Sequence, residues 1–533
     1  MKLSRIWILA ILACLPAAAQ PVIKGVANAA SFAVAGLPSS DIALGSMFVI
    51  FGTGLGPANL TQVSSYPLPT TQGLAGTTVN INTASFAGQT NAILIYTSAT
   101  QIAAIVPSSL NFTGTVDLTV SYGGRTSNAF FVRLTNSSFG AFTVNQSGFG
   151  AAVAYNYNSG SDQPLNSIAA PATPGQLVTL WGTGLGPVKG AETQGPLPGQ
   201  LNLPIQTYVG GKLAQLSYYG RSGCCSGIDQ VVFAVPQGVA GCAVPVDVVI
   251  NGVPSNTAVI AVSTDGSACS DALGTSSSDV QVGSNNGTAR FANVTLTHND
   301  GGNPTDSGSA SFTSTPFVKY AAGLEGSPAP GSCIVISGSG SNPSFPPSPS
   351  TALDAGSAIT VSGPGGAGGT MTKLKDGSYG GTLGPVQAGS YMVSGSGGAD
   401  VGPFGVSMIV PGPITWTNRA AVTSITPGNS LTINWNASDS NSYVTIDGLA
   451  LGNSAGGTVF GLFVCVEHAG VGTFSVPGYI TAALPTGQGA VVLTQNGTPS
   501  RFGAQGIDQG FLAYATGSAV GPVPVGSPGG GKK

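Results

Sequence analysis

The stretch Gly45-Ser-Met-Phe-Val-Ile-Phe-Gly-Thr-Gly-Leu-Gly-Pro57 joins a short apolar run to a turn rich in glycine. It returns later in the chain as Gly175-Gln-Leu-Val-Thr-Leu-Trp-Gly-Thr-Gly-Leu-Gly-Pro187. Each copy predicts a buried strand followed by a backbone turn that glycine accommodates more easily than other residues. The glycines assigned to these structural turns are Gly52, Gly54, Gly56, Gly182, Gly184 and Gly186. The repetition predicts two homologous domains.

The same glycine spacing resembles the start of a dinucleotide-binding loop. That loop needs a third glycine at longer spacing, a helix directly after it and an acidic residue about 20 positions on. Here Pro57 follows the turn and residues 58–69 show no helical period. We therefore predict a structural turn and no bound nucleotide.

The composition predicts an all-β protein. The chain has 533 residues with 81 Gly and 37 Pro, and short Val-, Thr- and Ile-rich runs alternate with turn residues, as in β-sandwiches. Hydrophobic residues make up 42%, which argues against general disorder. A net charge of −3 with only 16 Lys and Arg gives no electrostatic support for nucleic-acid binding.

The N-terminus predicts export. Lys2 and Arg5 precede a short apolar run, and Ala17-Ala-Ala19 offers a cleavage site, so residues 1–19 are predicted to be a cleaved signal peptide. Cys14 permits a lipoprotein as a rival interpretation that we rank lower. We predict a secreted protein, periplasmic or extracellular, with no membrane span.

Residues 20–140 and 141–265 repeat one order of strands. In both, an apolar run leads to the glycine turn, and later to Gln101-Ile-Ala-Ala-Ile-Val-Pro107 or Gln230-Val-Val-Phe-Ala-Val-Pro236. With the opening Asn28-Ala-Ala-Ser-Phe32, these motifs resemble TIG/IPT immunoglobulin-like domains, and more closely the uncharacterised secreted acidobacterial family called the Solibacter C-terminal domain. The resemblance covers about half the chain and implies tandem immunoglobulin-like β-sandwiches. It implies no catalytic residue.

The remaining chain predicts a glycine-rich β half. Residues 266–314 form a Ser/Gly-rich connector with some strands, residues 315–412 a third β domain and residues 413–520 a fourth domain of the sandwich type. In the fourth domain, Trp435 ends an alternating run where a sandwich buries its tryptophan. Residues 521–533 are predicted to be a flexible tail.

Six cysteines follow the signal peptide, and an even number in an exported chain predicts disulfides. They are Cys224, Cys225, Cys242, Cys269, Cys333 and Cys465. A bond between the neighbours Cys224 and Cys225 would be strained. The scheme is therefore Cys224–Cys242 with Cys225–Cys269, or the reverse, a choice that stays open. Cys333 and Cys465 are then left for each other.

The chemistry-bearing residues predict no catalytic site, metal site or cofactor. His298 and His468 are the only histidines, and Glu467 beside His468 faces the other side of a strand. We predict a non-catalytic protein that binds an extracellular polysaccharide or protein. A purely structural spacer is the alternative, and a secreted glycan-active hydrolase ranks third. Ligand and oligomeric state stay open. Exposed Tyr155, Tyr157, Tyr218 or Tyr219 would favour sugar binding.

Overall fold

The computed structural model describes residues 20–83, 89–272, 274–299, 305–341 and 350–526. The predicted signal peptide, with Cys14, and the end of the predicted tail lie outside these residues. The chain forms two compact units: one holds residues up to Val26, Val49–Ile105 and Thr115–Val132, and the other holds Ala27–Phe48, Val106–Gly114 and the chain from Arg133 on.

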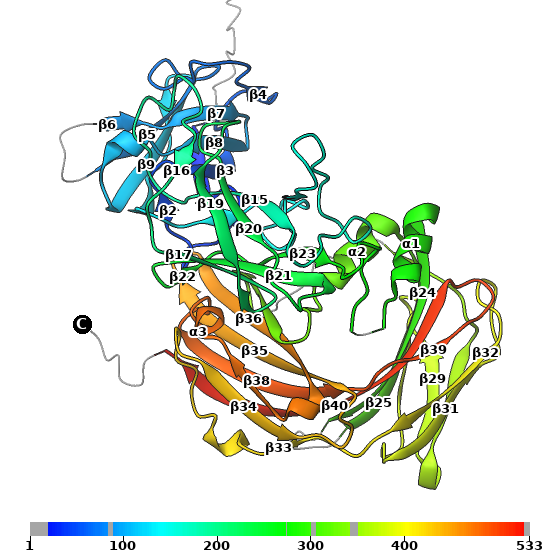
Figure 1. The fold of residues 1–533 in the computed structure, drawn as a ribbon. Coiled ribbons are helices and arrows are strands. Elements are labelled where there is room, and N and C mark those ends of the chain that lie inside the picture. The colour runs from blue at the N-terminus through cyan, green and yellow to red at the C-terminus, as the bar shows by residue number, and fades with distance from the viewer. Residues whose placement is uncertain (1–19, 84–88, 273, 300–304, 342–349, 527–533) are drawn as a thin grey trace, which may run out of the picture. The chain divides into compact units, whose positions relative to one another are not determined.

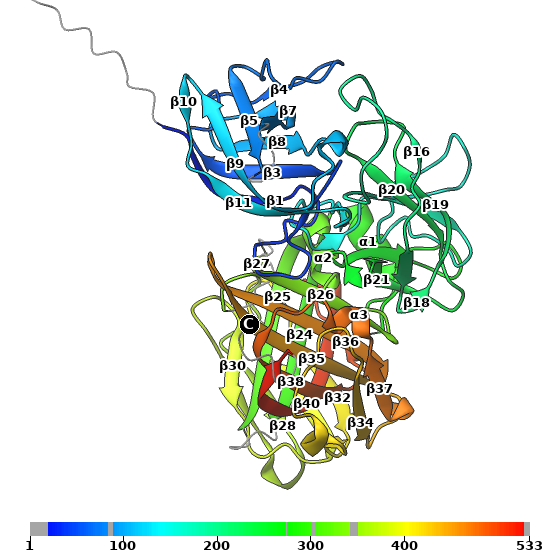
Figure 2. The same ribbon diagram turned by 90° about the vertical axis from the view of Figure 1, so that its left-hand side faces the viewer.

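The first repeat is built from two β-sheets, which Figure 2 shows in dark blue to cyan. One has the order β1 (Val22–Asn28), β3 (Met47–Thr53), β8 (Gln101–Ile105), β7 (Ile93–Thr97), β4 (Thr61–Gln62). The other has the order β2 (Ile42–Ala43), β11 (Phe130–Thr135), β9 (Gly114–Tyr122), β5 (Thr77–Asn82), β6 (Gln89–Asn91), with β10 (Arg125–Thr126) beside β9. Strand β5 shows the alternation that favours a strand over a helix. Its residues Thr77, Val79 and Ile81 are buried and alternate with half-buried residues.

The second repeat has the same plan. One sheet has the order β12 (Gly140–Ala141), β15 (Leu177–Thr183), β20 (Asp229–Ala234), β19 (Gln215–Arg221), β16 (Gly199–Gln200), with β14 (Ala154–Asn156) beside β15. The other has the order β13 (Gly150–Ala151), β23 (Ala258–Val262), β21 (Gly241–Ile250), β17 (Ile205–Val209), β18 (Lys212–Leu213), with β22 (Val253–Pro254) beside β21. Every residue of β21 is buried, and the strand lies between β23 and β17 in the middle of its sheet.

The C-terminal half contains one 14-stranded sheet, which curves through Figure 1 from orange β36 past β40 to green β25. Its first half has the order β26 (Ser332–Ser339), β36 (Gly457–His468), β35 (Tyr443–Ser454), β38 (Gly487–Asn496), β40 (Gln509–Val525), β24 (Thr288–Asn299). It continues with β25 (Thr305–Pro316), β30 (Tyr379–Thr382), β29 (Gly368–Lys373), β28 (Ala358–Ser362), β31 (Gly389–Gly395), β32 (Phe404–Val410), while β27 (Thr351–Ala352) pairs with β25 and β39 (Ser500–Phe502) with β40.

Two hydrophobic cores lie along this one sheet. The first includes Leu296, Phe312 and Tyr514. The second includes Ile433 and Trp435, and here the sheet is accompanied by a small sheet of β33 (Thr415–Trp416), β34 (Leu431–Asn436) and β37 (Thr473–Val476). Strands from the ranges 315–412 and 413–520 therefore share one sheet, joined through β24, β25 and β40.

Short helices interrupt the sheets: α1 (Ser277–Asn286), α2 (Phe317–Leu324), α3 (Gly478–Thr481), and 3-10 turns at Ser108–Leu110, Pro364–Gly366, Arg419–Ala421 and Ala469–Val471. Helix α1 buries only Val280 and Gly283, so its sequence has no marked apolar face. Its start is fixed locally instead, because Ser276 and Asp279 form a reciprocal capping box. No described helix has the length and apolar character needed to cross a membrane.

The second sandwich packs against the C-terminal sheet within the same unit. Ala243 and Val259 share a buried cluster with Ile334, Ile336 and Phe460. The rings of Tyr208 and Tyr479 stack with centroids 4.3 Å apart. The structure thus confirms the predicted all-β class, with two homologous immunoglobulin-like sandwiches followed by a β-rich C-terminal half.

Candidate functional site

The repeated glycine turns are closely packed backbone. Gly54 and Gly184 both have positive φ, at 65° and 104°. A Cβ atom built on Gly184 would lie 2.2 Å from the carbonyl oxygen of Ser138, which leaves no space for a side chain. Side chains larger than hydrogen are therefore disfavoured at Gly184 by both conformation and space.

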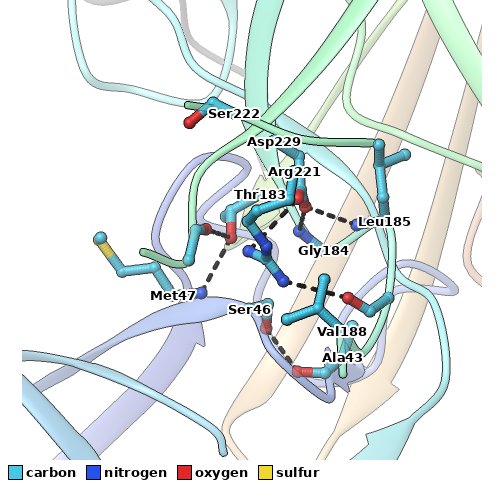
Figure 3. A network of polar contacts seen from close by, with 12 residues as sticks. Ala43, Ser46, Met47, Thr183, Gly184, Leu185, Val188, Arg221, Ser222 and Asp229 are labelled. Carbon is cyan, nitrogen blue, oxygen red and sulfur yellow. Dashed lines mark hydrogen bonds and ion pairs between the residues drawn. The ribbon is translucent and has the colours of Figure 1, made fainter. Parts of the chain in front are cut away.

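The second turn surrounds a buried arginine, shown in Figure 3. The side chain of Arg221 is 1% exposed, and its Nη1 lies 3.3 Å from Oδ1 of Asp229. Its Nη2 donates to the carbonyl oxygen of Gly186 and lies 3.8 Å from Oε1 of Glu192. On the other side, Oδ2 of Asp229 accepts from the amides of Gly184 and Leu185, both at 2.8 Å. The Arg221–Asp229 ion pair therefore binds the second glycine turn through both residues: Arg221 contacts its Gly186 carbonyl, and Asp229 contacts the amides of Gly184 and Leu185.

Hydrogen bonds also join the second glycine turn and its neighbours to segments much earlier in the chain. The Thr183 hydroxyl donates to the Gly227 carbonyl and accepts from the Met47 amide, at 2.6 and 2.8 Å. The Ser108 amide donates to Oε2 of Glu192 at 2.8 Å. We call the side chains of Arg221, Asp229, Glu192 and Thr183 the Arg221 network. It is buried, so it organises the backbone and offers no open face to a ligand.

In the first repeat, backbone carbonyl groups hold the equivalent turn. There the amides of Gly52 and Leu55 donate to the carbonyl oxygens of Thr100 and Ala99. In the second repeat the Asp229 carboxylate accepts from the turn amides. The loop Gly220–Gly227, which only the second repeat has, thus brings Arg221 to the glycine turn, where it pairs with Asp229.

Three carboxyl groups with raised pKa values predict how the stability of the protein depends on pH. Burial raises the pKa of Asp229 to about 6, although Arg221 and the two amides oppose the rise. Burial also raises the pKa of Asp247 to about 7, opposed by its hydrogen bond from Thr257, and the pKa of Asp447 to about 6. All three folded-state pKa values lie above the unfolded value of about 4.

We therefore expect stability to fall as the pH rises through about 4 to 7, because the folded state binds more protons than the unfolded chain in that window. Melting temperatures at about pH 5 should exceed those at about pH 8. Asp247→Asn keeps an oxygen for Thr257 and removes the charge, so it should flatten the profile. Asp376→Asn, at a fully exposed turn, serves as control. A melting temperature that rises from pH 5 to 8 would contradict this assignment.

The cysteines pair differently from the sequence-based scheme. Cys242 bonds to Cys269, and Cys333 bonds to Cys465. Cys224 and Cys225 are exposed and make no disulfide. The predicted pairing of these two with Cys242 and Cys269 is wrong, because Cys242 and Cys269 meet in a buried apolar cluster while Cys224 and Cys225 lie on the exposed loop.

Most of the tyrosines considered for sugar binding have other contacts. Tyr155 packs edge-on against Trp181 with centroids 6.4 Å apart, and the Tyr218 hydroxyl donates to the carbonyl oxygen of Arg221. Tyr219 packs against the core of the second sandwich. Tyr157 is 44% exposed. The four do not form one aromatic platform.

A cavity of about 300 Å³ lies in the C-terminal sheet, and we call it the His298 cavity. Leu296 and His298 on β24 lie in register with Tyr514 and Thr516 on β40, so these four line one face of the sheet. Pro411 and Pro413 close the cavity from the segment after β32. Leu296, Val410 and Tyr514 also belong to the first of the two cores, so the site lies at the edge of that core.

The polar groups of the His298 cavity are held by the hairpin of β24 and β25. His298 Nδ1 lies 2.5 Å from Oδ1 of Asp306, its partner across the hairpin. Oδ2 of Asp306 accepts from the Val386 amide at 2.8 Å, which positions Val386 and Gln387 in the cavity wall. One carboxylate therefore orients both the imidazole ring and the neighbouring loop.

Thr516 is a buried cavity residue that the sequence did not indicate. Its side chain is 4% exposed, and its hydroxyl oxygen has no hydrogen-bond partner among the described residues. Buried hydroxyls in proteins nearly always have a partner, and for a hydroxyl that lines a cavity this partner is a water or a bound molecule. The clue available in the sequence was Asp306, a carboxylate close to His298 along the chain, and the two residues are paired across β24 and β25.

The described residues contain no cluster of three or more His, Cys, Asp or Glu side chains suited to a metal ion. His468 pairs its ring with Tyr443 at 4.8 Å, and Oε1 of Glu467 accepts from the His468 amide. No step of acid–base chemistry follows from that pair.

No protein-family model and no curated protein matches this chain. Among solved structures, a tetra-tandem repeat from the extending region of a large adhesion protein aligns with 13% identity over 94% of this chain and 100% of that chain, with a TM-score of 0.13. Invasin, a bacterial integrin-binding protein, aligns with 10% identity over 93% of this chain and 79% of its own, with a TM-score of 0.14.

A third alignment is to SGBP-B of the Bacteroides ovatus mixed-linkage glucan utilization locus, solved in complex with a mixed-linkage heptasaccharide. The identity is 10%, the coverage is 87% of this chain and 97% of that chain, and the TM-score is 0.13. At such scores none of these alignments carries an argument about function. The candidate site therefore rests on the geometry of the His298 cavity.

Proposed function

We propose that this chain is a secreted, non-catalytic binding protein whose C-terminal sheet holds a saccharide unit in the His298 cavity. The observation that carries the proposal is the buried hydroxyl of Thr516, which lines the cavity without a protein partner. A ligand hydroxyl would supply the missing hydrogen bond. The volume of about 300 Å³ falls at the lower end of small-ligand sites.

The lining fits the two kinds of surface that a sugar presents. Leu296, Pro411 and Pro413 offer apolar contact for the C–H face of a ring. His298, Gln387 and Thr516 offer hydrogen-bonding groups for its hydroxyls. The proposal makes the ligand a neutral extracellular polysaccharide. A protein partner is the competing ligand class.

The predicted signal peptide and the two disulfides support the secreted location in this proposal. The predicted signal peptide directs the chain out of the cytoplasm. Two disulfides suit an oxidising compartment. The Gln-x-x-x-x-Val-Pro motifs begin within the equivalent strands β8 and β20, which supports tandem immunoglobulin-like repeats.

The proposal predicts that Thr516→Val abolishes or weakens glycan binding at least about tenfold, because it removes one buried hydrogen bond without changing side-chain shape. A glycan array identifies the ligand, and titration of the best glycan measures the loss. Thr297→Val, on the same strand as His298 but facing the opposite side, is the matched control and should bind normally. Equal binding by both variants, or cleavage of the bound glycan, would contradict the proposal.

A structural spacer remains the second candidate because of the Arg221 network. The network is buried and joins Met47 and Ser108 to the second glycine turn, which stiffens that part of the chain. Such stiffness suits a protein that holds other domains at a distance. If no glycan or protein ligand is found and Thr516→Val has no effect on any binding, the spacer is favoured.

A further inference from the structure

A second cavity, of about 330 Å³, lies between the second sandwich and helix α2, and we call it the Glu325 cavity. Strands of the sandwich contribute Val259 and Ala261, and the helix contributes Phe317 and Ala321. Its floor includes Cys242, whose disulfide to Cys269 lies in a buried cluster with Ile168. The Cys242–Cys269 disulfide therefore fixes the position of Cys242 in the cavity lining.

The mouth of this cavity exposes large apolar side chains. Val144 is 49% exposed, Leu165 is 40% exposed and Val318 is 76% exposed, and all three line the cavity. Single exposed apolar residues are normal, but three around one opening mark a surface that an apolar molecule would cover. The body of the ligand is therefore expected to be apolar.

Glu325 is the one ionisable side chain among the residues that line this cavity. Its carboxylate accepts from the amide of Ala151, and burial raises its pKa to about 7. The space for it depends on Gly150, where a Cβ atom would lie 2.2 Å from Oε2. The carboxyl group is thus built into an apolar wall at a position where the backbone leaves space for it.

The two asparagine side chains that line the cavity already have protein partners, and the Ser167 hydroxyl accepts from the Ala170 amide. Asn166 donates to Asn156 and to the carbonyl oxygen of Ala261, and its side-chain oxygen accepts from the Ala261 amide. Asn145 donates to the carbonyl oxygen of Phe149. A ligand in the cavity would therefore meet Glu325 as its principal polar contact.

We propose that the Glu325 cavity binds a small apolar amine, with the ammonium group on the Glu325 carboxylate and the hydrocarbon body against Val259, Phe317 and Ala321. Charge complementarity selects the ligand class: a carboxylate in an apolar site needs a cationic partner or a strong donor. The ligand lies outside the His298 cavity, so the two proposals are independent.

The test is titration of the full chain with three probes of similar size at about pH 8: 2-phenylethylamine, 2-phenylethanol and 3-phenylpropionate. We expect the amine to bind about tenfold more tightly than the alcohol, since a hydrogen bond to a charged group is roughly twice as strong as a neutral one. The carboxylate probe should bind most weakly. Equal affinity for all three probes, or no binding of the amine, would overturn the proposal.

Two variants separate the roles of charge and space. Glu325→Gln keeps an oxygen for the Ala151 amide and should remove the preference for the amine while leaving alcohol binding in place. Ala321→Trp should fill the cavity and abolish binding of all probes. Glu467→Gln, a carboxyl group outside the cavity, is the control and should retain the tenfold preference. A preference that survives Glu325→Gln would show that another group selects the amine. Glycan binding tested through Thr516→Val stays a separate readout.

Discussion

Replacing Arg221 with methionine is expected to lower the free energy of unfolding by about 3–5 kcal/mol. The methionine fills similar space but leaves Asp229 and Glu192 buried, at 0% and 6% exposed, without their cation. It also removes the donor to the Gly186 carbonyl, so the second glycine turn loses its fixed partner. Urea unfolding, followed by tryptophan fluorescence, measures the change.

Two further variants decide whether the charge is the cause. Arg133→Met removes an arginine whose side chain is 72% exposed and lies 3.7 Å from Asp41, and it should cost less than about 1 kcal/mol. The triple variant Arg221→Met, Asp229→Asn, Glu192→Gln removes all three charges and should recover much of the loss. If Arg221→Met is as mild as Arg133→Met, the network does not stabilise the fold.

The individual strands and the buried tryptophan could be predicted because short stretches of sequence determine them. The apolar runs before the two glycine turns became β3 and β15, and alternating runs became strands such as β5. Trp435, expected in the interior, is 2% exposed. These features depend on period and turn chemistry, which neighbouring residues determine.

Features that depend on distant pairing could not be predicted in the same way. The Ser/Gly-rich connector supplies β24 and β25, the long strands at the middle of the 14-stranded sheet, because strand partners are chosen by the whole sheet. The parallel pairing of β24 with β40 joins Phe291 to Gln509, far apart in sequence. Local composition marks such a segment as a connector, although tertiary pairing makes it central.

The candidate sites were missed for a similar reason. The sequence-based predictions for the loop Gly220–Gly227 concerned Cys224 and Cys225 and did not include Arg221. In a chain with only 16 Lys and Arg, an arginine beside an apolar strand was the available signal. Thr516 and Glu325 gave none, because a hydroxyl without a partner and a carboxyl in a cavity exist only once the fold is formed.

Removing the Cys333–Cys465 disulfide is expected to destabilise the protein more than removing Cys242–Cys269. The first closes a sequence separation of 132 residues and the second one of 27. Loop-closure entropy in the unfolded chain then gives about 5 kcal/mol for the longer loop and about 3.5 kcal/mol for the shorter. Cys333 and Cys465 also face each other between β26 and β36, so their bond fastens an edge strand of the sheet.

Paired alanine variants, Cys333→Ala with Cys465→Ala and Cys242→Ala with Cys269→Ala, measure both losses by urea unfolding. Alkylation of native protein before reduction should label Cys224 and Cys225 and leave these four cysteines unlabelled. Cys224→Ala with Cys225→Ala is the matched control and should change stability by less than about 0.5 kcal/mol, because both side chains are exposed and form no disulfide. Equal losses for the two disulfides would show that native-state contacts around each bond, rather than the length of the closed loop, determine its contribution.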